Sequence, residues 1–460
     1  MSIPFDNSFV NLPKSFYTRQ DPVPVASPAL VKFNHRLAQA LGLDGADFTP
    51  DVLSGNQVPE GASPLAAAYA GHQFGGFVPQ LGDGRAVLLG EVIAPNGLRH
   101  DIQLKGAGRT HFSRGGDGRA AIGPVLREYL VSEAMHALGV PTTRALGAVT
   151  TGEPVQRETP LPGAVLTRVA KSHLRVGSFQ FHYARQDKAS LEALEAYARQ
   201  RHYPEAKTPL EFLDAVIEAQ AKLVAKWMGL GFIHGVMNTD NCSIAGETID
   251  YGPCAFMDTY HPETVFSSID RQGRYAYANQ PKIAVWNLAQ LAQTLVPLIG
   301  DIEKLEASLD RFDDIYTLAF KKVFTSKFGL AKPDVDFIVG TLKMMADEGV
   351  DFTLFFRRIS YDLPIDDLFE NASTAQEWLP DWQKRTSSET VGKMKTVNPV
   401  FIPRNHRVEV ALEAANQGDF APFEKLHRVL SNPFDEQSEN AEYEIPPTED
   451  ECVLATFCGT

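Results

Sequence analysis

The stretch HGVMNTDNCSIAGETIDYG, residues 234–252, decides how this chain can fold and act. It sets acidic and amide side chains among small and apolar residues, with Asp240 beside Asn241 and Asp250 near the end. Oxygen ligands of this kind suit Mg²⁺, which takes one or two protein carboxylates and completes its shell with water and substrate phosphates. The stretch therefore predicts a magnesium site. The alternative is a pair of ordinary turns, in which Asp, Asn and Gly are common.

The spacing within this stretch matches the catalytic segment of protein kinases. Kinases carry His-Arg-Asp-x-x-x-x-Asn and then Asp-Phe-Gly, in which the Asn and the second Asp bind metal and the first Asp is the base. His234 and Asn241 keep that spacing, and Asp250-Tyr-Gly stands where Asp-Phe-Gly would. Val236 occupies the position of the base and cannot accept a proton. The pattern predicts kinase-like metal ligands without the usual base.

Composition bounds the class of protein. The chain has 460 residues, 44% hydrophobic and 22% charged, which is ordinary for a soluble globular protein. Its net charge of −14 argues against broad binding to nucleic acid or to an anionic membrane. We find no apolar run near the roughly 18 residues of a membrane span, and no secretion or transit signal at the start. Four cysteines do not make a disulfide framework, so we expect a cytoplasmic protein with neither nucleic acid nor membrane as partner.

Glycine-rich segments precede two strands that we expect in the first third of the chain. Gly82 and Gly84 lead into the apolar, β-capable residues 86–94, and glycine lets backbone amides approach phosphates without a Cβ. A hairpin turn is the alternative. The next strand ends at Lys105, about where a kinase places its phosphate-binding Lys after the glycine loop. Taken alone, Lys105 is better explained as a solvated strand end, and its distance from Gly84 is what favours the phosphate-binding role.

A helix is predicted over residues 123–138, because Pro124 suits its first turn and Gly139 its end. In kinases the helix at this place carries the Glu that pairs with the Lys. Glu128 and Glu133 are the candidates, and helical spacing puts Glu133 nearer the apolar stripe without settling the choice.

Arg168 and Arg175 are cations in a region with few acids. Arginine forks bind phosphate oxygens bidentately, and charged hydrogen bonds of this kind contribute about 1.5–3 kcal/mol each. Two surface arginines are the alternative. Apolar periodicity predicts further helices over residues 27–41, 209–229, 282–299, 301–328 and 334–346.

Five segments together make the chain similar to the selenoprotein O family of kinase-fold protein adenylyltransferases. They are QLGDGRA at 80–86, LKGAGRT at 104–110, GDGRAA at 116–121, HGVMNTDN at 234–241 and IDYGP at 249–253. The resemblance covers nearly the whole chain. It implies an α+β, bilobal protein-kinase-like fold with a β-rich N-lobe, a helical C-lobe and a C-terminal helical extension, with boundaries expected at residues 1–165, 166–325 and 326–460.

The resemblance also implies a reaction and a site. ATP binds inverted relative to kinases, and AMP passes to Ser, Thr or Tyr hydroxyls of proteins. Asp240 is the implied proton acceptor, Asn241 and Asp250 the implied Mg²⁺ ligands, and Glu128 the implied partner of Lys105. The implied ATP contacts are Gly82, Gly84, Arg85, Lys105, Asp117, Gly118, Arg168, Arg175 and Asp250. The sequence leaves open whether Mn²⁺ or UTP is used.

Two cysteines suggest a redox pair. Cys254 follows the metal-binding segment, and Cys458 stands where eukaryotic members of the family carry selenocysteine; a bridge between them would tether the tail over the site. Two buried, reduced thiols are the alternative, because the cytosol is reducing. For the whole protein the alternatives are an atypical kinase that transfers the γ-phosphate and a catalytically dead ATP-binding scaffold.

Overall fold

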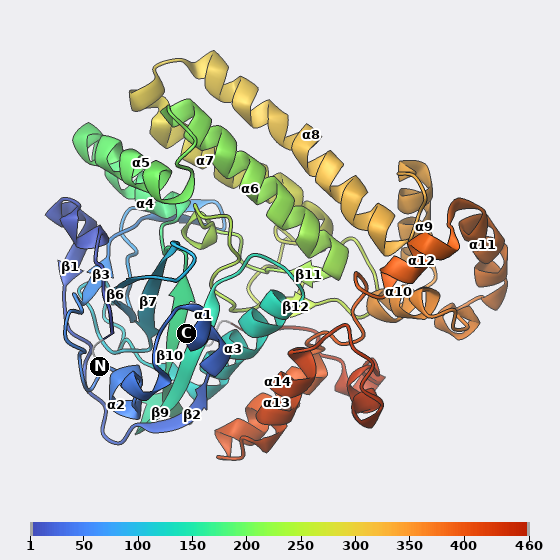
Figure 1. Cartoon of the computed structure of the whole chain (residues 1–460), viewed down its shortest axis with the longest axis horizontal. Coiled ribbons are helices and arrows are strands. Elements are labelled where there is room, and N and C mark those ends of the chain that lie inside the picture. The colour runs from blue at the N-terminus through green and yellow to red at the C-terminus, as the bar shows by residue number, and fades with distance from the viewer. Residues whose placement is uncertain (1–2, 458–460) are drawn as a thin grey trace.

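A computed structural model describes residues 3–457 of the chain as a mixed α/β structure. An antiparallel sheet lies at the lower left of Figure 1, and three long helices lie above it and extend to the right. These helices are α6 (Pro209–Leu230), α7 (Gln280–Ile299) and α8 (Ile302–Lys327). None of the helices in the described part of the chain is long and apolar enough to cross a membrane.

The main sheet positions the candidate site residues of the first third of the chain. Within residues 3–457 it has eight strands, and all paired neighbours are antiparallel. The strands follow the order β1 (Tyr17–Arg19), β3 (Leu65–Ala67), β6 (Ala86–Ile93), β7 (Arg99–Lys105), β10 (Pro160–Ala170), β9 (Arg144–Gln156) and β2 (Ala29–Phe33), with β8 (Ala120–Ala121) paired to β10.

The register of β7 brings three distant stretches together. Lys105 lies opposite Ala86 of β6 on one side and opposite Leu166 of β10 on the other. Arg168 of β10 lies opposite Gln103 of β7. Because alternate residues of a strand share a face, Gln103 and Lys105 project to the same side of the sheet.

Helix α3 (Ile122–Ala137) is enclosed between the sheet and the C-terminal helices. One side packs on β9 and β10, and the other contacts α13 (Asn405–Asn416) and α14 (Ala421–Leu430), as Figure 1 also shows. This enclosure explains why helical spacing could not single out one buried face, since nearly all of the helix is buried.

Helix α6 has the boundaries that the sequence predicts. The Thr208 hydroxyl accepts a hydrogen bond from the amide of Glu211 at 3.2 Å, Pro209 opens the first turn, and Gly231 ends the helix at φ +67°. The chain then enters the stretch 234–252 through the short strand β11 (Phe232–Ile233), which pairs with β12 (Ala255–Phe256). The long helix and this strand pair hold both ends of that stretch.

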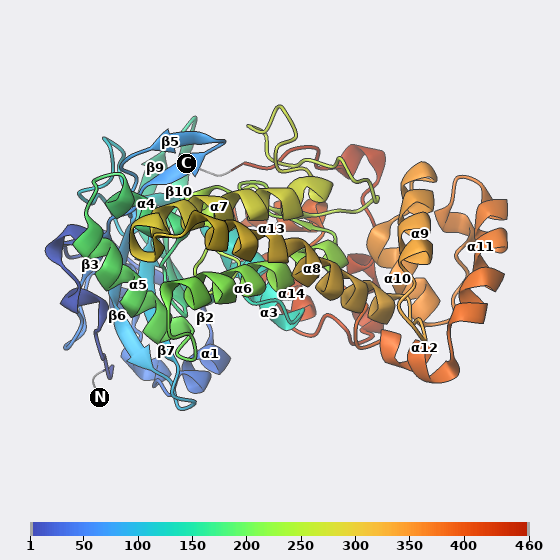
Figure 2. The same cartoon turned by 90° about the horizontal axis from the view of Figure 1, so that it is seen from above.

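The remaining elements surround this frame. They are α1 (His35–Ala40), α2 (Pro50–Ser54), α4 (Val176–Tyr183), α5 (Lys188–His202), α9 (Val335–Asp347), α10 (Phe352–Ser360), α11 (Ala372–Arg385), α12 (Ser388–Met394) and the hairpin β4 (Gly71–Gln73) and β5 (Gly76–Val78). Figure 2 shows α9 to α12 grouped at the end of the molecule farthest from the sheet.

One predicted helix is wrong. Residues 27–41 contain β2 and then the short helix α1, which is capped by Asn34, whose side chain accepts from the Leu37 amide at 3.0 Å. Residues 29–33 pair with β9 at the edge of the sheet, so tertiary pairing overrides their helical spacing. The other predicted helices are confirmed to within one or two residues.

Candidate active site

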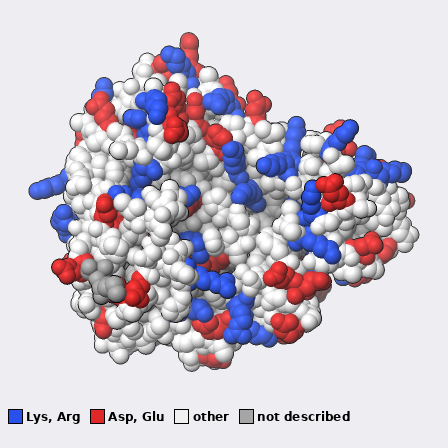
Figure 3. Space-filling view, in the orientation of Figure 1, with Lys and Arg blue, Asp and Glu red and all other residues white. Residues whose placement is uncertain are grey.

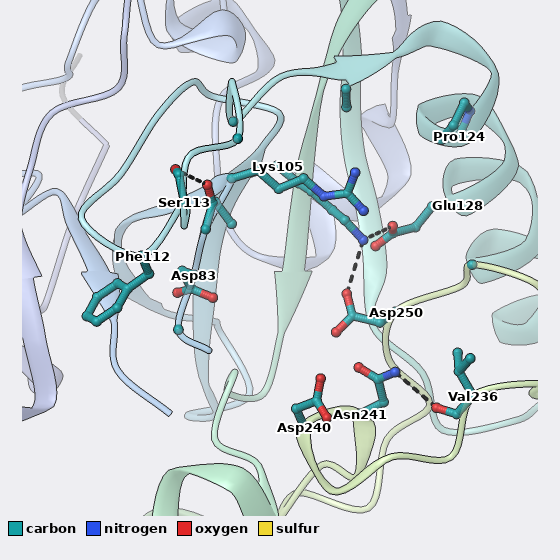
Figure 4. A pocket seen from close by; sticks show the side chains of 18 of the residues that line it. Asp83, Lys105, Phe112, Ser113, Pro124, Glu128, Val236, Asp240, Asn241 and Asp250 are labelled. Carbon is teal, nitrogen blue, oxygen red and sulfur yellow. Dashed lines mark hydrogen bonds and ion pairs between the residues drawn. The ribbon is translucent and has the colours of Figure 1, made fainter. Parts of the chain in front are cut away.

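A cavity of about 800 Å³ lies among the sheet, α3 and the stretch 236–252. Figure 4 looks into it and shows Asp250 between Lys105 and Asn241, with Asp240 beside Asn241. The cavity is bordered by every residue that the sequence indicated for nucleotide binding, metal binding or proton transfer: Gly82, Gly84, Arg85, Lys105, Asp117, Gly118, Glu128, Arg168, Arg175, Asp240, Asn241 and Asp250.

Lys105 is held between two acids. Its Nζ donates to Glu128 Oε2 at 2.5 Å and to Asp250 Oδ1 at 3.0 Å. Lys105 comes from the end of β7, Glu128 from the second turn of α3, and Asp250 from the loop before β12. The pairs join the sheet, the helix and the segment before β12 at one point.

Asp250 is the centre of the charge network. Arg168 Nη1 donates to Asp250 Oδ1 at 2.7 Å and Arg175 Nη2 lies 3.5 Å from Oδ2. Burial alone would raise the pKa of Asp250, but Arg168, Lys105 and Arg175 outweigh it and hold the pKa well below its usual value. Asp250 is therefore ionised at neutral pH. Its φ of +60° is unusual for a residue with a Cβ, and such backbone strain is typical of functional sites.

Arg175 is a buried cation whose guanidinium has N–H donors that make no hydrogen bond. Only 2% of its side chain is exposed, and its Nε and Nη2 have no hydrogen-bond partner. The guanidinium lies over the ring of Tyr69, 4.4 Å from the ring centre. Unpaired donors on a buried charge are costly, so their presence at the edge of a cavity indicates a site for an anion.

Asn241 and Asp240 belong to one short turn, Thr239–Asn241. The Asn241 side-chain amide donates to the Val236 carbonyl at 3.0 Å, which leaves its oxygen as the group available to a cation. Asp240 is 8% exposed, and burial raises the pKa of its carboxyl to about 6. A carboxylate with that pKa is well placed to accept a proton near neutral pH.

The glycine-rich loop over residues 106–119 closes the cavity from the side of the sheet. Gly118 has φ +69°, and a Cβ there would lie 2.1 Å from the carbonyl oxygen of Gly108, so only glycine fits. Asp117 pairs with Arg157 at 2.9 Å, and this pairing outweighs burial and lowers the pKa of Asp117.

Comparison with known proteins identifies the family of the chain. A family model described as Protein adenylyltransferase SelO matches residues 1–431. This chain belongs to the SelO family.

Relatives of the same family match over the full length. The chain is 55% identical to a protein of Ruegeria pomeroyi named protein nucleotidyltransferase YdiU, over 100% of both chains. Proteins of the same name from Rhizobium johnstonii and a Bradyrhizobium species are each 55% identical, over 100% and 99% of this chain and 98% and 99% of their own. Membership of the SelO family makes the chain a nucleotidyltransferase.

Within this SelO-family site, the two glutamates of α3 have separate partners. Glu128 contacts Lys105 and also Arg168 at 3.1 Å. Glu133, which helical spacing had favoured, receives two hydrogen bonds from Arg144, each of 2.8 Å, and does not border the cavity. The helical-spacing indication for Glu133 as the partner of Lys105 is therefore wrong, because α3 is buried on both sides and both glutamates find cations.

The donor set fits a metal ion that the substrate helps to hold. Asn241 offers one oxygen, and Asp250 offers Oδ2, because its Oδ1 already accepts from Lys105 and Arg168. Residues 3–457 contain no group of three or more His, Cys, Asp or Glu that could hold a metal by itself. An ion held by two protein oxygens needs water and phosphate oxygens for the rest of its shell, which is the usual situation of Mg²⁺.

Three cavity residues, and one residue behind the cavity, were not indicated by the sequence motifs. Tyr69 stacks under Arg175, Gln73 contacts Asp240, Arg157 pairs with Asp117, and Gln103 accepts from Arg168 Nε at 2.7 Å behind the site. Gln103 could have been found from the strand pattern, because it shares a face with Lys105. Tyr69 and Arg157 lie in loops and Gln73 in the short hairpin β4–β5, so no periodic pattern reports their contacts.

Of the two cysteines of the predicted redox pair, only Cys254 is among the described residues. Cys254 is 1% exposed, and Cys458 lies outside the described residues. The last described part of the tail does lie near this segment, because the Thr456 hydroxyl donates to the Pro253 carbonyl at 2.6 Å. The pairing of Cys254 with Cys458 stays a prediction.

Proposed function

We propose that this SelO-family chain transfers AMP from ATP to Ser, Thr or Tyr hydroxyls of proteins. The observation that carries the proposal is Arg175, a buried guanidinium with unpartnered donors, beside Lys105 and Arg168 and across from Asn241 and Asp250. An anion that binds here would contact the three cations. A divalent ion bound to the same anion could be held by the side-chain oxygens of Asn241 and Asp250. A nucleoside triphosphate with its metal has that charge pattern.

The charge of the cavity supports a polyphosphate ligand. The chain as a whole is acidic, with a net charge of −14, and acidic and basic side chains are interspersed over the face in Figure 3. The cavity lining differs, because its arginines and lysine outnumber its acids. The cations are Arg85, Lys105, Arg114, Arg119, Arg157, Arg168 and Arg175, and the acids are Asp83, Asp117, Glu128, Asp240 and Asp250.

Asp240 would serve as the proton acceptor. The acceptor oxygen attacks the α-phosphorus, its proton passes to Asp240, and the bond from the α-phosphorus to the bridging oxygen breaks to release pyrophosphate. A positioned base of this kind contributes about 10²–10⁴-fold in rate. Mg²⁺ or Mn²⁺, held by Asn241 and Asp250, would supply charge neutralisation at the phosphates. Lys105, Arg168 and Arg175 orient the phosphates and offset the charge that develops on them.

Val236 supports nucleotidyl transfer over phosphoryl transfer. It stands where a protein kinase has its base, so a hydroxyl placed as in a kinase would find no proton acceptor. Asp240 lies four positions later, on the turn that carries Asn241. We infer that ATP binds inverted relative to kinases, with its α-phosphate at this turn.

The bilobal kinase-like fold is part of the same proposal. It is supported by the strand-borne Lys105, the helix-borne Glu128 and the long helix α6 that precedes the metal-binding stretch. The N-lobe would comprise residues 1–165, the C-lobe residues 166–325 and the C-terminal extension residues 326–460. In this arrangement α13 and α14 of the extension return to cover α3 of the N-lobe.

Labelled nucleotides test the proposal directly. The protein is incubated with Mg²⁺ and ATP that carries ³²P at the α- or at the γ-phosphate, and label on protein is measured after denaturing electrophoresis. AMP transfer places label on protein from the α-labelled nucleotide only. Label from γ-labelled ATP alone would show an atypical kinase. ATP-dependent thermal stabilisation with no label from either nucleotide would show a catalytically dead scaffold.

A further inference from the structure

The hairpin β4–β5 is bound to the turn that carries Asp240. It forms a two-stranded sheet separate from the main one, over part of the sequence AGHQFGGF at residues 70–77. The His72 amide donates to Thr239 Oγ1 at 2.7 Å, and the Phe74 amide donates to Asn238 Oδ1 at 3.0 Å. These two hydrogen bonds flank Gln73 and fix the position of its backbone independently of its side chain.

The side chain of Gln73 reaches the proposed proton acceptor. Its Nε2 donates to Asp240 Oδ2 at 3.2 Å, and Gln73 borders the nucleotide cavity. The other oxygen, Asp240 Oδ1, is buried and has no hydrogen-bond partner. Oδ1 lies against Gly71, where a Cβ would come within 2.7 Å of it. Strand β4 therefore fits around the Asp240 carboxylate. Gly71, which has no Cβ, leaves space for Oδ1, and Gln73 donates a hydrogen bond to Oδ2.

This fit determines how the carboxylate is turned. The terminal torsion of Asp has a broad, shallow profile, so contacts with neighbours set its orientation. An unpartnered buried oxygen favours rotation toward any available donor. The Gln73 donor opposes that rotation by holding Oδ2. A carboxylate oxygen has more than one acceptor site, so Oδ2 can accept from Gln73 and from a second donor at the same time.

We propose that Gln73 is a positioning residue for Asp240, which keeps Oδ2 turned toward the acceptor hydroxyl. The inference rests on the proposed function, because it assigns Gln73 a role through the proton acceptor. The side-chain hydrogen bond of Gln73 goes to Asp240 and not to Lys105 or the arginines, so we assign its contribution to the chemical step and not to nucleotide binding.

The test replaces Gln73 with Met, which keeps the length of the side chain and removes the donor. The backbone bonds of His72 and Phe74 stay in place, so the hairpin is expected to fold and the melting temperature to stay the same. We expect kcat for transfer from α-labelled ATP to fall about tenfold to a hundredfold, as for other losses of orientation, with KM for ATP unchanged. Self-labelling of the protein serves as the acceptor reaction.

A double-mutant cycle shows whether Gln73 acts through Asp240. In the Asp240→Asn background, Gln73→Met is expected to cause no further loss of kcat. Equal losses in both backgrounds, or a rise in KM for ATP, would overturn the proposal. Gln180→Met is the matched control, because Gln180 accepts from Thr239 Oγ1 at 2.6 Å and supports the hairpin and turn without contact to Asp240.

The outcomes separate this inference from the proposed function. A loss of kcat in Gln180→Met equal to that in Gln73→Met would assign the effect to rigidity of the hairpin and reject the role of Gln73. A wild-type protein that transfers no α-label rejects both the proposed function and this inference. A wild-type protein that transfers α-label with additive losses in the cycle rejects only the inference.

Discussion

Replacement of Glu128 with Gln tests a buried part of the charge network. The Glu128 side chain is 5% exposed and accepts from Lys105 at 2.5 Å and from Arg168 at 3.1 Å. Charged hydrogen bonds contribute about 1.5–3 kcal/mol each, and Gln can keep one of the two as a neutral acceptor. Lys105 and Arg168 would then depend more on their hydrogen bonds to Asp250 Oδ1, to which both already donate.

We expect kcat/KM for transfer from α-labelled ATP to fall roughly 100-fold in Glu128→Gln. That loss equals about 2.7 kcal/mol at about 1.36 kcal/mol per tenfold change, close to one charged hydrogen bond. The assay measures initial rates of labelling over a range of ATP concentrations. Thermal unfolding of the same samples checks that the variant is folded.

Glu133→Gln is the matched control on the same helix. Glu133 accepts two hydrogen bonds of 2.8 Å from Arg144 and lies away from the cavity. Its loss weakens a partly buried ion pair, so we expect a destabilisation of about 3 kcal/mol with kcat/KM close to the wild-type value. If Glu133→Gln lost as much activity as Glu128→Gln, or Glu128→Gln kept more than half of it, the assignment of Glu128 to the nucleotide site would be refuted.

Three other outcomes are expected. Gly118→Ala places a Cβ against the Gly108 carbonyl and should abolish thermal stabilisation by ATP. Gly116→Ala, at a position where φ is not positive, should keep that stabilisation. Equal loss in both variants would show that the conformation of Gly118 is not what ATP binding requires. Asp240→Asn should slow transfer about 10²–10⁴-fold with ATP binding unchanged in calorimetry, and a normal rate would exclude Asp240 as base. Burial lowers the pKa of Lys327 to about 7, so the unfolded chain takes up its proton at a higher pH than the folded one. The wild-type free energy of unfolding should therefore rise by roughly 2 kcal/mol from pH 7.5 to 9 relative to Lys327→Met, as measured by urea denaturation; parallel curves would contradict this.

The local sequence predicted most of the long helices and the strand that ends in Lys105. Helix α6 is an example, because Thr208, Pro209 and Gly231 mark its ends through bonds within a few residues. The edge strand β2 was missed, because its partner β9 lies more than a hundred residues away and no local pattern reports that pairing. The choice between Glu128 and Glu133 failed in the same way, since helical spacing assumes one buried face and α3 has two.

The sequence by itself determined the chemical groups of the site, because the spacing of His234, Asn241 and Asp250, the glycine segments and the family motifs are all properties of neighbouring residues. Only the tertiary structure decided how those groups are paired. The ion pairs of Asp250 with Lys105, Arg168 and Arg175, and the contact of Gln73 with Asp240, join segments separated by about 75 to 170 positions along the chain. Such contacts depend on sheet register and on the packing of loops, and the energy that fixes them comes from burial of the whole core.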